Sequence, residues 1–161
     1  MALFYADASA LVKLVRDEPE SPALRTFLTG ADLVSSELVL TEVPRAIRRA
    51  AAQDPRLTLD VLMVRAGQLI DSLGLLPLDR ALLLVAGAFA EPVLRALDAI
   101  HIAAAVDLAP LDGFVSYDER QAAAARLAGL RTMSPGVLTT SRPAVGSTDM
   151  TRETDSAGEK R

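Results

Sequence analysis

Four acidic residues stand beside apolar segments of this chain, where carboxylates are uncommon. Asp7 ends the first apolar run, Glu42 lies in a helical segment, Asp98 lies in an almost wholly apolar stretch, and Asp118 follows another short apolar run. A carboxylate avoids apolar surroundings unless it is paired or binds a cation. Together the four residues predict a metal-binding site of the kind that nucleases use.

The residue types also predict which metal such a site would hold. Two unit charges about 4 Å apart repel by roughly 4 kcal/mol at an effective dielectric constant of about 20, and a divalent cation reverses the sign of that interaction. The chain has no cysteine and one histidine, which disfavours zinc. Oxygen ligands suit Mg²⁺ or Mn²⁺, and such ions polarise a phosphodiester and generate hydroxide from water.

Three of these carboxylates also have a structural interpretation. Asp7 and Asp118 each precede a helical pattern, so either side chain could cap a helix. Glu42 lies at the rim of an apolar helical stripe, where a surface salt bridge to Arg45 or Arg49 is the alternative. At the level of sequence these alternatives stay open.

Asp98 gives the strongest single signal. The stretch around it is apolar on nearly every helical face, so its carboxylate needs a cation or several hydrogen bonds. The residues from Val93 onward predict that the helix begins well before Asp98, which argues against a capping role. His101 follows one turn later, and we expect it chiefly to pack within the helix, with a supporting role at the site as the alternative.

Two further groups of polar residues could serve the site. Ser9 and Lys13 are four residues apart on the first helix and can face the same way, although a capping serine and an exposed lysine are the alternatives. Arg45, Arg48 and Arg49 form a small basic patch on the third helix. The patch is either a solvated face or a contact for an RNA backbone or an acidic partner.

The elements that must position these residues follow from the alternation of short apolar runs with helical patterns. Strands are expected at 2–6, 32–35, 73–78, 113–116 and 130–133. Helices are expected at 7–16, 20–28, 37–52, 58–72, 80–89, 93–108 and 119–127. Pro44 should kink the third helix, because it removes one hydrogen bond. The alternation predicts an α/β fold with a parallel sheet between helices and a site at the carboxyl ends of its strands.

Composition bounds the protein class. Residues 1–138 are expected to form one domain, since half of the chain is hydrophobic, whereas residues 139–161 have the composition of a disordered hydrophilic tail. The net charge of −4 argues against a broad basic face for nucleic acid. No signal peptide is evident, and no apolar run approaches the roughly 18 residues of a membrane span. We therefore expect a soluble cytoplasmic protein with no membrane partner.

Four motifs surround the carboxylates. They are Asp-Ala-Ser-Ala-Leu-Val-Lys from Asp7, Ser-Glu-Leu-Val-Leu-Thr-Glu-Val around Glu42, Leu-Asp-Ala-Ile-His-Ile-Ala-Ala-Ala around Asp98, and Val-Ser-Tyr-Asp ending at Asp118. In this order they resemble the PIN domain, and specifically the VapC-type ribonuclease toxins of toxin–antitoxin modules. The likeness covers residues 2 to about 138, so the domain is expected to be a PIN-like nuclease domain.

The resemblance implies a PIN-like three-layer fold, with a parallel sheet of about five strands flanked by helices, in a homodimer. It implies a metal-dependent endoribonuclease that cleaves an RNA substrate and acts as the toxin of a type II toxin–antitoxin system. A cognate antitoxin protein, VapB-like, would neutralise it, for example by placing an arginine among the carboxylates.

The resemblance also implies roles for single residues. Asp7 and Asp98 would be the firmest ligands of Mg²⁺ or Mn²⁺, Glu42 a ligand or the group that orients the attacking water, and Asp118 a ligand of a second, weaker ion. All four would thus be catalytic. Two hydroxyls would support them: that of Ser9, and that of Ser116, which stands where the family often has threonine.

Two other protein classes share part of this pattern. An aspartate-based phosphatase also begins with an aspartate after its first strand, but it needs a second one two residues later, where this chain has Ser9. A catalytically silent PIN-like binding module would be expected to lack an acidic ligand, and this chain keeps all four. The ribonuclease interpretation is therefore preferred, with these two as alternatives.

Overall fold

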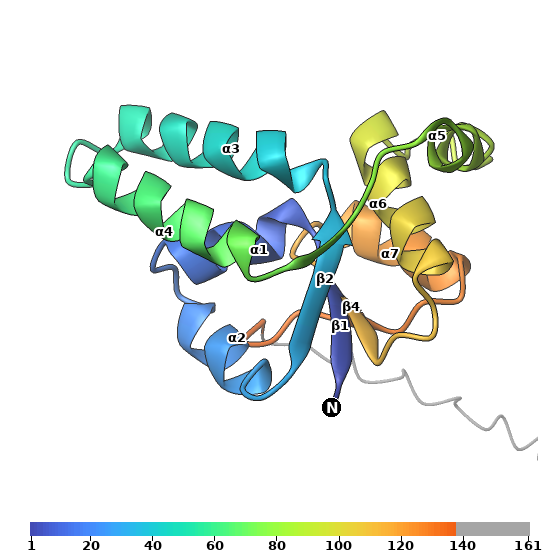
Figure 1. Cartoon of the computed structure of the whole chain (residues 1–161), viewed down its shortest axis with the longest axis horizontal. Coiled ribbons are helices and arrows are strands. Elements are labelled where there is room, and N and C mark those ends of the chain that lie inside the picture. The colour runs from blue at the N-terminus through green and yellow to red at the C-terminus, as the bar shows by residue number, and fades with distance from the viewer. Residues whose placement is uncertain (138–161) are drawn as a thin grey trace, which may run out of the picture.

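The computed structural model describes residues 1–137, and within them it contains five strands and seven helices (Figure 1). The strands are β1 (Leu3–Ala6), β2 (Asp32–Ser36), β3 (Gly74–Leu76), β4 (Gly113–Val115) and β5 (Thr132–Met133). The helices are α1 (Ala8–Val15), α2 (Ser21–Phe27), α3 (Val39–Gln53), α4 (Leu59–Asp71), α5 (Arg80–Gly87), α6 (Ala96–Asp107) and α7 (Glu119–Leu127). None of these helices is long and apolar enough to span a bilayer.

The five strands form one parallel sheet in the order β3-β2-β1-β4-β5. The order reverses at β1, which pairs with β2 on one side and with β4 on the other. Ala6, the last residue of β1, lies opposite Val115, the last residue of β4. In such sheets binding sites form at the carboxyl ends of the strands where the order reverses, which here is the end of β1 and β4.

Helices cover both faces of the sheet. Figure 1 shows α1 to α4 on one side and α5 to α7 on the other. Phe4 and Val115 pack into the core beneath α1 to α4, and Tyr5 and Phe114 pack into the core beneath α5 to α7. Successive strand residues point to opposite faces, so each strand contributes to both cores.

The fold confirms the predicted three-layer α/β architecture and its five-stranded parallel sheet. One local expectation is wrong: the helix that carries Asp98 begins at Ala96 rather than at Val93, so Asp98 lies in its first turn. Pro44 lies inside α3, which runs from Val39 to Gln53 without a break, and the kink expected there stays a prediction. The predicted tail, residues 139–161, lies outside the described residues.

Candidate functional site

The predicted carboxylates line one cleft at the carboxyl edge of the sheet. Asp7 follows β1, Glu42 lies on α3, Asp98 on α6, and Asp118 immediately before α7. All four contribute to the wall of a cleft of about 700 Å³. The fold therefore brings together residues that are separated by up to 111 positions in the chain, from Asp7 to Asp118.

Asp7 is built into the end of β1. Its carboxylate is 2% exposed and accepts three hydrogen bonds: from the Ser9 hydroxyl at 2.7 Å, the Ala10 N–H at 2.9 Å and the Ser116 hydroxyl at 2.7 Å. The bond from Ala10 caps α1, so the capping interpretation and the site interpretation hold together. Burial raises the pKa of Asp7, and the bonds from the two serines oppose that rise.

Ser116 links Asp7 to a second buried side chain, Gln121. The Ser116 hydroxyl has one hydrogen, which it donates to Asp7, so it has none for the Gln121 Oε1 atom 3.2 Å away. Gln121 is 2% exposed, lines the cleft, and its Nε2 has no partner within residues 1–137. Turning its terminal amide by 180° lets Nε2 donate to Ser116, and this orientation supports the bond from Ser116 to Asp7.

Glu42 is held by a histidine rather than by an arginine. Its Oε2 lies 2.7 Å from His101 Nε2, and His101 Nδ1 lies 2.8 Å from the Tyr5 hydroxyl. His101 and Tyr5 are 2% and 0% exposed, and burial raises the pKa of Tyr5 well above its usual range. The alternative interpretation, a salt bridge from Glu42 to Arg45 or Arg49, is absent from the described part of the chain.

Asp98 and Asp118 are less constrained. Asp118 caps α7 by accepting hydrogen bonds from the N–H groups of Arg120 and Gln121 at 2.9 and 3.2 Å. Asp98 is partly buried in the first turn of α6, and its carboxylate accepts no hydrogen bond from any residue that the structure describes. Burial raises the pKa of Asp98, and the negative charge of Asp118 raises it further.

The donor set fits a hard divalent cation in its chemistry. The cleft offers carboxylate oxygens from four elements, and the like charges near Asp98 make a bound cation favourable there. Within residues 1–137, however, no three Asp, Glu or His side chains are already arranged around a single point as a metal cage. Binding would therefore require the less constrained side chains of Asp98 and Asp118 to turn towards Asp7.

The two walls of the cleft differ in charge. On the α1 wall, Lys13 Nζ lies 2.5 Å from Glu18 and 2.8 Å from Glu20, and it also lies 4.8 Å from the centre of the Tyr117 ring. Burial works to lower the pKa of Lys13, but the hydrogen bonds to the two glutamates outweigh it and raise that pKa. The charge of Lys13 is thus neutralised by Glu18 and Glu20. On the same wall, burial raises the pKa of Tyr117 to about 12.

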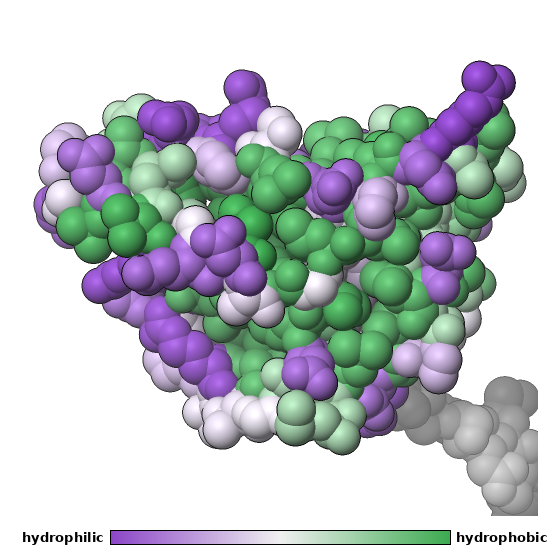
Figure 2. All heavy atoms as spheres, viewed as in Figure 1, coloured by the Kyte–Doolittle hydropathy of each residue, from purple (hydrophilic) through white to green (hydrophobic). Residues whose placement is uncertain are grey.

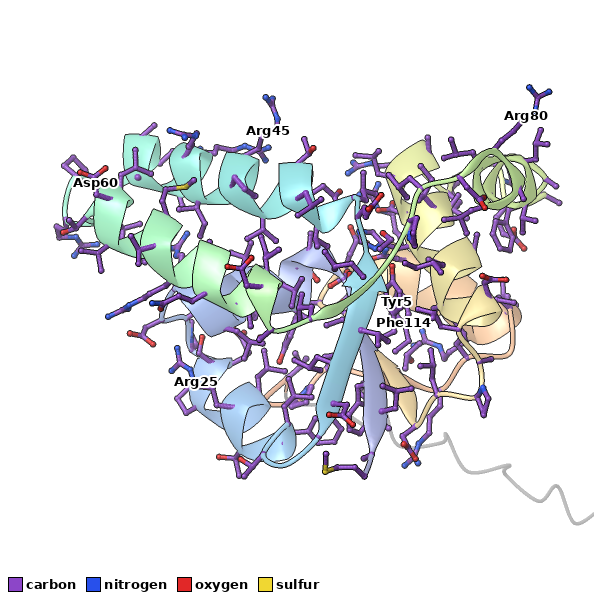
Figure 3. All side chains as sticks on the ribbon, in the orientation of Figure 1. Tyr5, Arg25, Arg45, Asp60, Arg80 and Phe114 are labelled. Atoms are coloured by element: carbon purple, nitrogen blue, oxygen red, sulfur yellow. The ribbon has the colours of Figure 1, made fainter. Side chains whose placement is uncertain are left out.

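On the α3 wall, Arg45 and Arg49 are exposed, line the cleft, and form no ion pair with another described residue. Figure 3 shows Arg45 projecting from α3 into solvent. Arg48, on the same helix, is exposed but does not line the cleft. One wall therefore offers two free positive charges, and the other offers none.

The sequence does not predict two residues of this site, Tyr5 and Gln121, and it predicts His101 chiefly to pack, with a supporting role at the site as the alternative. Tyr5 has the pattern of an ordinary strand residue. The sequence holds one signal for Gln121, a lone amide in the alanine-rich segment 119–128 that follows Asp118. Tyr5 and His101 lie 96 residues apart in the chain, so the hydrogen bond between them cannot be predicted from sequence spacing.

Comparisons with known proteins give the same family. The family model of the PIN domain matches residues 4–127. Ribonuclease VapC47 of Mycobacterium tuberculosis (strain CDC 1551 / Oshkosh) is 39% identical over 142 residues, which cover 84% of this chain and 99% of the relative. Ribonuclease VapC46 of strain ATCC 25618 / H37Rv is 39% identical over 143 residues (84% and 99%), and Ribonuclease VapC35 of both strains is 36% identical over 140 residues (83% and 98%).

Proposed function

The chain belongs to the PIN domain family, and within it to the VapC-type ribonucleases, and from this premise we propose that it is a metal-dependent endoribonuclease. One observation carries the proposal: the four carboxylates line a single cleft at the carboxyl edge of the parallel sheet, and one of them, Asp98, accepts no hydrogen bond from the described residues. A carboxylate left without partners beside like charges is suited to hold a cation.

Asp7 and Asp98 would hold the ion, and Asp118 would add a ligand or hold a second, weaker one. Mg²⁺ and Mn²⁺ fit the all-oxygen donor set, and the bound ion supplies an activated water and stabilises the charge that develops on the phosphate. Ser9 and Ser116 keep the Asp7 carboxylate in place, each through a hydrogen bond of 2.7 Å.

The charge difference between the walls supports a direction for the substrate. Arg45 and Arg49 are one turn apart on α3 and each can reach a phosphate, whereas Lys13 is occupied by Glu18 and Glu20. The RNA backbone would therefore run along the α3 wall, with the scissile phosphate over the carboxylates. The local basic wall offsets the unfavourable net charge of −4.

We further propose that the protein is a toxin neutralised by a cognate VapB-like antitoxin, that it acts in the cytoplasm, and that it forms a homodimer. The hydrophobic surface over α5 and α6, green in Figure 2, supports the last point. Between Arg80 and the start of α6, Leu83, Leu84, Val93 and Leu97 are large apolar residues that are 44 to 74% exposed. Exposed apolar patches of this kind are typical of protein interfaces.

The test is cleavage of a single-stranded RNA by the full chain with Mg²⁺ or Mn²⁺ and with EDTA. Wild type should cut only with metal, and Asp98→Ala should not cut. Asp107→Ala is the matched control, because Asp107 is an exposed aspartate at the far end of the same helix, outside the cleft. If wild type fails to cut RNA and its induction leaves cell growth and cellular RNA intact, the binding-module alternative replaces this proposal.

The backbone path is tested by RNA binding in the inactive Asp98→Ala background. Removing both Arg45 and Arg49 should weaken binding and lower the slope of log affinity against log salt by about 1.4, since each phosphate contact on a single strand contributes roughly 0.7. Arg48→Ala removes one positive charge from the same helix outside the cleft and should have little effect, whereas Arg45→Ala or Arg49→Ala alone should lower the slope by about 0.7. Equal effects of these changes would contradict the proposed path.

A further inference from the structure

His101 has a partner on each ring nitrogen, and the two partners come from different elements. Its Nε2 lies 2.7 Å from Oε2 of Glu42 on α3, and its Nδ1 lies 2.8 Å from the hydroxyl of Tyr5 on β1. The histidine itself is on α6 and is 2% exposed. A buried chain of hydrogen bonds therefore runs from the centre of the sheet to a carboxylate of the cleft.

The chemistry of the three groups offers one direction of donation that satisfies all of them. An ionised carboxylate only accepts hydrogen bonds, so Nε2 must carry the proton that points at Glu42. A phenol has one hydrogen to give, and Nδ1 is placed to accept it. The arrangement is then fully satisfied with a neutral ring: Tyr5 donates to His101, and His101 donates to Glu42.

Tyr5 is held firmly enough to fix the orientation of the imidazole. Its ring stacks on Phe114, with ring centres 5.3 Å apart and planes 6° apart, and both residues are labelled at the sheet in Figure 3. The Tyr5 ring also meets the His101 ring edge-on, with ring centres 5.8 Å apart. Tyr5 is fully buried. Because the phenol and the imidazole are both confined, the Nε2–H direction is set by the core of the protein.

We propose that His101 is a positioning residue that holds Oε2 of Glu42, with Tyr5 fixing its tautomer, so that Glu42 serves the reaction through its remaining oxygen. The inference rests on the proposed nuclease function. With one oxygen occupied, Glu42 is suited to orient the attacking water rather than to bind a metal ion through both oxygens. His101 acts through Glu42 and does not itself touch the substrate.

The tautomer can be observed directly, because His101 is the only histidine in the chain. In untagged protein with ¹⁵N-labelled histidine, one pair of nitrogen signals reports on this ring. At neutral pH, Nε2 should show the shift of a protonated nitrogen and Nδ1 that of a bare one. Tyr5→Phe, which removes the donor to Nδ1, should give a mixture of tautomers. A ring protonated on Nδ1 in wild type would overturn the proposal, whether or not the protein cleaves RNA.

The functional arm compares His101→Leu with His101→Gln. Leucine removes the donor to Glu42, whereas the glutamine amide can restore an N–H near the position of Nε2. We expect His101→Leu to lower kcat about 10 to 100-fold with KM little changed, and His101→Gln to recover most of that loss. Mg²⁺ affinity, measured by calorimetry, should stay close to wild type in both variants.

Stability is checked separately, since His101→Leu strands the buried Tyr5 hydroxyl. The double variant with Tyr5→Phe removes that hydroxyl and should recover stability without recovering kcat. If wild type cleaves RNA and His101→Leu cleaves it equally well, the positioning role is wrong although the nuclease function stands. A large loss of Mg²⁺ affinity in His101→Leu would instead make Glu42 a main metal ligand and overturn the assignment of Glu42 to the water.

Discussion

Asp7 and Asp98 face the same cleft, and burial raises the pKa of both, yet the protein treats them differently. Asp7 is almost fully buried and accepts three hydrogen bonds from the ends of α1 and β4. Asp98 lies in the first turn of α6 and accepts none from the described residues. One carboxylate is part of the fold, and the other has no hydrogen-bond donor among residues 1–137.

The largest effect that separates them should be on stability. Asp7→Ala removes the cap of α1 and leaves the hydroxyls of Ser9 and Ser116 without their acceptor, so it should lower the free energy of unfolding by about 2 kcal/mol. Asp98→Ala removes no hydrogen bond within the described residues and should not lower it. Urea unfolding in EDTA measures both variants, and equal losses would show that the two carboxylates are bound alike.

A smaller effect should appear in the pH dependence of the metal-free protein. Because the folded state raises the pKa of Asp98 above its ordinary value of 3.8, the folded state binds the proton more tightly than the unfolded state does. Stability is therefore lost as pH rises from 3.8 through the folded pKa, and the ionised Asp98 destabilises the metal-free protein at neutral pH.

Asp98→Asn should consequently raise the thermal midpoint in EDTA at pH 7, and this gain should shrink as pH falls towards 3.8. Added Mg²⁺ should stabilise wild type more than the variant, because a ligand stabilises the state that binds it. Asp107→Asn, on the exposed end of the same helix, is the control and should show neither behaviour. If Asp98→Asn lowers the midpoint in EDTA, the carboxylate has a structural partner after all.

The contrast between Asp7 and Asp98 also shows which parts of the site can be predicted from the sequence. Asp7 could be placed because a buried strand ends just before it, and strand ends of a parallel sheet meet at one edge. The sequence places the start of the helix before Asp98 too early, because the apolar Val93 and Leu94 extend the helical pattern of the residues that follow. Periodicity reports which residues prefer burial but not where the first hydrogen-bonded turn begins.

The sequence could not predict the hydrogen-bond partners that different elements bring to the site. The bond from His101 to Tyr5 and the contact from Ser116 to Gln121 depend on rotamers and on the packing of α6 and α7 against β1 and β4. A lone histidine among alanines has the same sequence signature whether it packs or donates. The motifs predict the four carboxylates. The contacts that hold Glu42 through His101 and that connect the Asp7 donor Ser116 to Gln121 become visible only in the folded structure.

Near the end of the described residues, the chain contacts the segment that donates a hydrogen bond to Asp7. Ser134 donates to the Ser116 carbonyl at 2.6 Å, and Tyr117 donates to the Pro135 carbonyl at 2.7 Å. These contacts attach residues 134 and 135 to the segment that carries the donor to Asp7. A chain that ends at Leu138 keeps all of them.

The smallest effect is therefore expected from removing residues 139–161. This segment balances four acidic against four basic residues and has few apolar ones, and from this composition we predict that burial does not offset an ordering cost of roughly 1 to 2 kcal/mol per residue. The chain ending at Leu138 should keep its thermal midpoint, its Mg²⁺ binding and its RNA cleavage. The stability difference between Asp7→Ala and Asp98→Ala should also be the same in the shortened chain as in the full one. A large drop in midpoint or cleavage would mean that the removed segment docks on the domain or helps to hold the substrate, and a changed difference would place it against one of the two carboxylates.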